Sequence, residues 1–141
     1  MEVLATVETD MFEHREVKPH FINACCFGED FAAWLRAKVM ESLGPDFVLS
    51  EPIQEDYGWG LWVTRSKVRY WIAVSYVGDG PQDGPVQWVI SVNREAGLNP
   101  INRVFRRPVA EDIDQVRASV RSAITSEPAL KIVPNPNYGM T

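Results

Sequence analysis

The chain is poor in cysteine and histidine, and it has no surplus of basic residues. It contains 2 cysteines, 2 histidines, and 14 lysines and arginines against 19 aspartates and glutamates, which gives a net charge of −5. Generic binding to nucleic acid requires an excess of positive charge, so we do not expect nucleic acid to be the main partner. The acidic balance favours a protein partner with a basic surface.

Long apolar runs are also missing. No stretch is long and apolar enough to span a bilayer, and the N-terminal residues lack the basic start and apolar run of a secretory signal. We therefore expect a cytoplasmic protein without membrane contact.

Residues that carry catalysis or bind metals show no informative spacing. The only cysteines are the neighbours Cys25 and Cys26, which could bridge each other only with backbone strain, so we expect reduced thiols. One of them could pair with His20 as nucleophile and base, but neither a third orienting residue nor the spacing of a zinc site accompanies them. The sequence thus predicts no catalytic residue, no metal site and no cofactor, and we lean toward a protein that is not an enzyme.

The length and composition predict one globular domain. The chain has 141 residues, of which 45% are hydrophobic and 23% are charged, enough to bury a core without a cofactor. We assign residues 1–133 to a single α+β domain and residues 134–141 to a loose C-terminal tail.

Two segments have the periodicity of amphipathic helices. In the first, Phe31, Leu35, Val39 and Leu43 recur every four residues, Trp34 widens the same stripe, and a Gly-Pro pair follows. The second covers residues 110–126, with acidic residues at its start and apolar residues at helical spacing.

Alternating segments rich in β-branched and aromatic residues predict strands at 3–7, 17–22, 47–53, 59–65, 68–77 and 86–92. Two of them are joined by Ser66-Lys67 alone, which forces an antiparallel hairpin. Within 68–77 one face is apolar throughout and the other is mixed, a pattern typical of a sheet covered by helices on one side. The predicted fold is α+β: an antiparallel sheet of about four to six strands with two main helices packed on one face.

The stretch EPIQEDYGWGLWVTR, residues 51–65, places acids, aromatic rings and glycines side by side. Glycine inside a strand marks a bulge or a close approach, so Trp59 and Trp62 could simply pack on opposite faces of a twisted strand. Alternatively, the stretch presents an acidic, aromatic surface for a partner. We expect Tyr57 rather than Trp59 to be the exposed ring. The candidate partner-binding residues are Glu51, Glu55, Asp56, Tyr57 and Trp59.

Three hypotheses for function follow. A compact acidic domain without catalytic spacing is similar in size and composition to small bacterial proteins that bind and neutralise another macromolecule, so the first is an inhibitor or immunity-type binding protein. The second is a small-molecule-binding module or minor enzyme with a pocket between sheet and helices, lined by Trp34, Tyr70 and Trp88. The third is a structural or self-associating domain, such as a homodimer formed through an edge strand.

Overall fold

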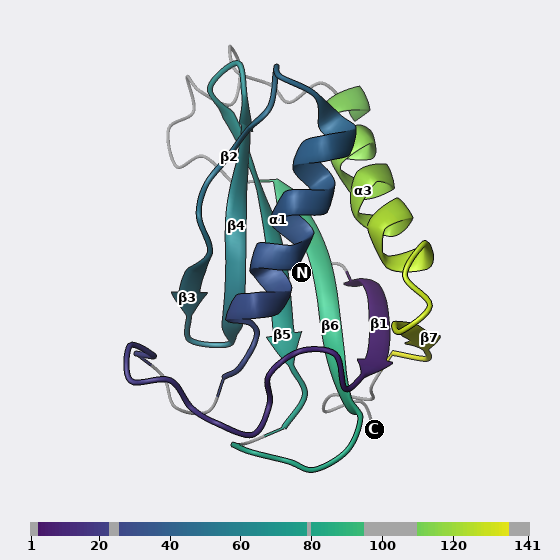
Figure 1. The fold of residues 1–141 in the computed structure, drawn as a ribbon. Helices are drawn as coiled ribbons and strands as arrows, with labels where there is room; N and C mark the ends of the chain where they lie inside the picture. The colour runs from purple at the N-terminus through teal and green to yellow at the C-terminus, as the bar shows by residue number, and fades with distance from the viewer. Residues whose placement is uncertain (1–2, 23–25, 79, 95–109, 136–141) are drawn as a thin grey trace, which may run out of the picture.

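The computed structural model describes residues 3–22, 26–78, 80–94 and 110–135. These residues form β1 (Val3–Thr9), α1 (Glu29–Leu43), β2 (Val48–Leu49), β3 (Ile53–Glu55), β4 (Gly58–Arg65), β5 (Val68–Tyr76), β6 (Val86–Arg94), α3 (Ala110–Thr125) and β7 (Lys131–Val133). The sheet has the order β2-β4-β5-β6-β1-β7, with β3 also paired to β4, and neighbouring strands are antiparallel. Both helices lie on one face of the sheet (Figure 1). The predicted α+β class is confirmed, with more strands than expected.

The first helix forms where its apolar spacing predicts it. Phe31, Leu35 and Val39 are fully buried, because residues four apart return to the same side of a helix. Trp34 and Leu43 are partly buried against the same core. On α3 the apolar stripe likewise faces the core, so the two helices and the sheet share one hydrophobic cluster.

Strand β5 turns its predicted apolar face toward the helices. Tyr70, Ile72 and Val74 are fully buried on the helix-covered face. The hairpin that leads into β5 turns at Ser66 and Lys67, which have φ angles of 51° and 67°. Two consecutive left-handed residues give the turn a twist that matches the flanking strands.

The strand expected at residues 47–53 is divided in two. Leu49 pairs with Val63, whereas Ile53 pairs with Gly60, so one extra residue lies between the two pairings. Ser50 lies at the break: its N–H donates to the Trp62 carbonyl, and its hydroxyl accepts from the Trp62 N–H. A bulge followed by Pro52, which has no N–H to donate, explains the interruption.

The strand predicted at residues 17–22 is wrong, because this segment is a loop. Phe21 closes a turn by donating its N–H to the Lys18 carbonyl, and the Ile22 N–H donates to the Gln54 side chain instead of a neighbouring strand. Pro19 cannot take part in a ladder as a donor. Local and side-chain contacts therefore replace the expected strand pairing.

Two smaller differences concern Cys26 and the C-terminal end. Cys26 is disulfide-bonded, so the expectation of a reduced thiol is wrong for this residue; Cys25 lies outside the described residues. Strand β7, which the sequence did not predict, pairs with β1. In the expected loose tail, Asn135 accepts a hydrogen bond from the Thr6 hydroxyl at 2.9 Å, and residues 136–141 lie outside the described residues.

Candidate functional site

The turn between β3 and β4 exposes three of the five candidate partner-binding residues. Glu55 and Asp56 are exposed, and Tyr57 is 38% exposed. The indole N–H of Trp71 donates to the Tyr57 hydroxyl at 2.5 Å, which orients the phenol. Burial raises the pKa of Tyr57; the hydrogen bond from Trp71 opposes the shift, and the charge of Glu55 adds to it. The turn thus presents a neutral phenol beside two acidic side chains.

Trp59 is not part of this surface. It is only 4% exposed and belongs to the core on the helix-covered face. Its indole N–H donates to the Cys26 carbonyl at 2.9 Å, and its ring lies 5.2 Å from the ring of Phe21. The ring therefore packs and cannot serve as an exposed anchor, whereas Tyr57 is exposed as expected.

The two glycines beside Trp59 are explained by close approaches to β5. A Cβ on Gly58 would overlap the Val74 carbonyl oxygen, and one on Gly60 would overlap the ring of Trp71 and the Ile72 carbonyl oxygen. Gly58 also has a backbone φ angle of 157°, which residues other than glycine rarely adopt. The glycines therefore make room for neighbouring backbone and for a tryptophan on the opposite face of the sheet.

Glu51 lies farther along the same sheet edge. It is 81% exposed and forms an ion pair of 3.4 Å with Arg36 of α1. Arg36 also donates to the carbonyls of Leu49 and Ser50, at 3.3 and 2.9 Å. Glu51 thus belongs to a contact that ties the interrupted strand to α1, separate from the turn at Tyr57.

Two exposed apolar side chains lie on β3 or in the loop beside it. Ile22 is 82% exposed, and its N–H donates to Gln54 of β3. Ile53, also in β3, is 38% exposed. We call Ile22, Ile53, Glu55, Asp56 and Tyr57 the edge surface. Sequence reasoning missed both isoleucines, because apolar residues in strand-like segments are normally assigned to the core.

The three residues of the expected pocket do not gather around one space. Trp34 and Trp88 both contact the ring of Phe31, at 6.0 and 5.5 Å. Tyr70 pairs with Arg94 at one end of β6, whereas Trp88 lies six residues away along that strand, a distance of roughly 20 Å. Tyr70 and Trp88 are fully buried, and among the described residues neither the hydroxyl of the first nor the indole nitrogen of the second has a hydrogen-bond partner.

Two shallow pockets lie elsewhere among the described residues. One, of about 260 Å³, lies between the helices and is lined by Lys38, Glu41, Ser42, Ser119, Ser122, Ala123 and Ser126. The other, of about 280 Å³, is lined by Leu4, Ala5, Thr6, Arg121, Ile124, Thr125, Ile132, Val133 and Asn135. Neither includes a residue of the edge surface.

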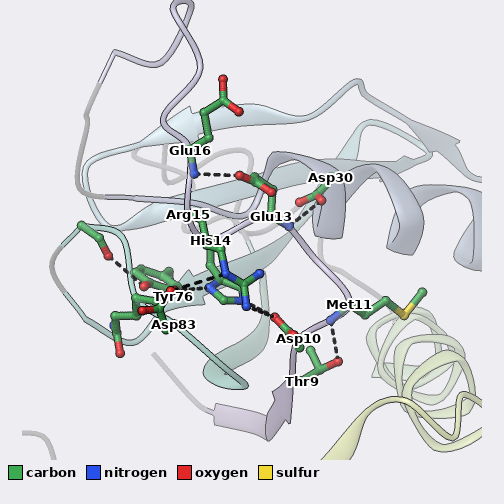
Figure 2. Close-up of polar contacts among 12 residues, drawn as sticks. Thr9, Asp10, Met11, Glu13, His14, Arg15, Glu16, Asp30, Tyr76 and Asp83 are labelled. Atoms are coloured by element: carbon green, nitrogen blue, oxygen red, sulfur yellow. Dashed lines mark hydrogen bonds and ion pairs between the residues drawn. The ribbon is translucent and has the colours of Figure 1, made fainter.

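A polar cluster that the sequence did not indicate surrounds His14 (Figure 2). The His14 side chain is completely buried, with Nδ1 2.8 Å from the Gln82 carbonyl oxygen and Nε2 2.5 Å from Asp10 Oδ1. The Gln82 N–H donates back to the His14 carbonyl at 3.1 Å, and Arg15 forms an ion pair with Asp10 at 3.1 Å. The cluster joins the β1–α1 loop to the β5–β6 loop, two segments 68 residues apart.

The first turn of α1 holds the rest of the β1–α1 loop. Nε2 of His20 lies 2.7 Å from both Glu29 carboxylate oxygens, and Asp30 accepts a hydrogen bond of 2.8 Å from the Glu13 N–H. Burial raises the pKa of Asp30, against the effect of its N–H donors. Since His20 is paired with Glu29 and Cys26 is disulfide-bonded, the nucleophile pair considered from the sequence is not formed by these two residues.

Within the described ranges, no group of three or more His, Cys, Asp or Glu side chains is placed to hold a metal ion. No helix in the same ranges is long and apolar enough to cross a membrane. The chain matches no protein-family model, no curated protein and no solved structure. Only the structure of the described residues therefore bears on its function.

Proposed function

We propose that this chain is a small, acidic, non-enzymatic binding protein of the inhibitor or immunity type, acting in a bacterial cytoplasm. Its partner is another protein with a basic surface, and it binds through the edge surface. The observation that carries the proposal is an 82% exposed isoleucine, Ile22, in a loop whose backbone is hydrogen-bonded to β3, the edge strand that carries Ile53 and leads into the turn with Tyr57 and two exposed acids.

This composition suits recognition of a protein. Interfaces combine apolar and aromatic side chains at their centre with a polar rim, and Ile22, Ile53 and Tyr57 supply the first while Glu55 and Asp56 supply the second. The net charge of −5 adds long-range attraction for a basic partner. A short edge strand interrupted by a proline resists strand addition, so side chains rather than backbone pairing would carry the binding.

The proposal is tested by reversing charge at the turn. Glu55→Lys with Asp56→Lys should leave thermal stability nearly unchanged, because exposed charges contribute under about 1 kcal/mol each. Binding to a partner first identified by affinity purification should weaken at least about tenfold, mainly through slower association, and wild-type binding should weaken with salt.

A matched control carries the same change in charge at the C-terminal end of α1 and in the residues that follow it. Glu41 and Asp46 are exposed, and Glu41→Lys with Asp46→Lys changes the net charge from −5 to −1, as the turn variant does, since each exchange adds two charges. The control should bind like the wild type. If the turn variant binds as tightly as the control at low salt, the edge surface is not the binding site. Light scattering on the pure chain separates a hetero-partner from a homodimer, which would favour self-association.

A further inference from the structure

The contacts of the His14 ring determine how many protons it carries. A carbonyl oxygen only accepts hydrogen bonds, so Nδ1, at 2.8 Å from the Gln82 carbonyl, must carry a proton. Nε2 lies 2.5 Å from a carboxylate oxygen of Asp10, and an ionised carboxylate also only accepts. The ring form that satisfies both acceptors is the doubly protonated imidazolium.

The charge of Asp10 supports this form. The hydrogen bond with His14 lowers the pKa of Asp10, with a further contribution from Arg15, so its carboxyl is ionised at neutral pH. Among the described residues, the other charged or titratable groups drawn beside the ring are Arg15, on the same loop, and Asp83 and Tyr76, on the side of the ring away from Asp10 (Figure 2). Asp83 lies 3.8 Å from Arg15, and the hydroxyl of Tyr76 donates to the Gly80 carbonyl.

We infer that Asp10, His14 and Gln82 form a pH-sensitive latch that fastens the β5–β6 loop to the β1–α1 loop. Loss of one proton from the ring leaves a nitrogen lone pair facing either the carbonyl or the carboxylate, and the completely buried ring has no access to water that could replace the lost contact. The proton-bound ring belongs to the fastened form, so the latch is stable at lower pH and loosens as the pH rises. Histidine is the side chain that changes charge closest to neutral pH.

Among the described residues, the other polar contact between the two loops at this point is the 3.8 Å ion pair of Arg15 with the exposed Asp83. Gln82 meets His14 twice, through its carbonyl and its N–H, while its own side chain donates to the Val77 carbonyl within the same loop. Asp83, the next residue, is fully exposed. The inference of the latch does not depend on whether the edge surface binds a partner. The two features are connected only through the β1–α1 loop, which the latch holds and which also carries Ile22.

Amide hydrogen exchange measured by NMR on the full chain tests the latch. The Gln82 amide donates to the His14 carbonyl, whereas the Val77 amide donates to Gln87 in the neighbouring ladder and serves as an internal control. After correction for the intrinsic rate, Gln82 protection should fall about tenfold between about pH 6 and pH 9, consistent with losing one charge-assisted hydrogen bond. Val77 protection should change far less, and ring nitrogen shifts should show two protons on His14 at about pH 6.

Two variants make the outcome decisive. Asp10→Asn can turn its amide N–H toward a neutral Nε2, so both ring contacts survive without the extra proton and the pH dependence of Gln82 should shrink to under about twofold. His20→Gln removes the only other histidine, which is exposed and paired with Glu29, and should leave that dependence unchanged. A singly protonated His14 ring at about pH 6, or equal pH dependence in Asp10→Asn and wild type, overturns the latch.

Discussion

Replacing Trp59 by alanine discriminates between a packing role and a binding role for this residue. The side chain is 4% exposed, lies in the core cluster and donates to the Cys26 carbonyl. The substitution removes both the buried ring and this hydrogen bond. We therefore expect a large loss of folding stability rather than a specific loss of binding.

The magnitude follows from the buried area. A tryptophan buries roughly 150–250 Å², which at about 25 cal/mol per Å² corresponds to roughly 4–6 kcal/mol as an upper bound. Large-to-alanine substitutions of aromatic core residues typically cost about 3–5 kcal/mol, and loss of the hydrogen bond from Trp59 to the Cys26 carbonyl adds about 1 kcal/mol. We expect a decrease in the free energy of unfolding of about 4–6 kcal/mol, a large part of the roughly 5–15 kcal/mol typical of a domain.

Urea unfolding followed by far-UV circular dichroism measures this change without depending on tryptophan fluorescence. The matched control is Tyr57→Ala on the same turn. Tyr57 is 38% exposed and bonded to Trp71, so its loss should cost only about 1–2 kcal/mol. The slope of the unfolding free energy against urea concentration should be the same in both variants if unfolding still exposes the same amount of surface.

Two results would refute this reasoning. A loss below about 1 kcal/mol for Trp59→Ala, with an unchanged slope, would mean that the ring does not contribute to the core as its burial indicates. A Tyr57→Ala variant that is as destabilised as Trp59→Ala would mean that the exposed ring carries the stability.

Three further changes test other parts of the structure. Gly60→Ala should lower the free energy of unfolding by about 1–3 kcal/mol in urea, because its methyl group would overlap an indole ring and a carbonyl of β5. Lys67→Gly should raise the melting temperature slightly, by the equivalent of about 0.5 kcal/mol, since φ is 67° at this position; no gain would show that the turn is not strained. The lowered pKa of Asp10 stabilises the fold above the ordinary value of 3.8, an effect lost as the pH falls. Asp10→Asn should therefore weaken the acid-range pH dependence of thermal unfolding, and an unchanged curve contradicts the pairing.

The elements that the sequence predicted depend on residues close together in the chain. The four-residue spacing from Phe31 to Val39 is enough to define α1 and its buried side, and two residues between β4 and β5 allow only a tight hairpin. The alternation of β5 follows from the two-residue repeat of a strand. Such patterns follow from backbone geometry, so they can be recognised without knowing which distant residues are in contact.

The same reasoning failed where a distant contact competes with the local pattern. Residues 17–22 alternate like a strand, yet His20 pairs with Glu29 and Ile22 with Gln54. An alternating pattern of apolar and polar residues indicates only that successive side chains could point to opposite sides of a strand. Whether a neighbouring strand is present to complete the hydrogen bonds depends on how the rest of the chain packs.

The tertiary structure also decided which members of the candidate site share a surface. Tyr57 lies in the exposed turn, whereas Trp59, only two residues later, lies in β4 and packs into the core on the helix-covered face. The ring of Trp71 in β5 lies against Gly60 in the neighbouring strand β4. His14 finds its partner 68 residues away. Sequence alone indicated which rings and charges were available; their exposure and partners arose from packing between segments far apart in the chain.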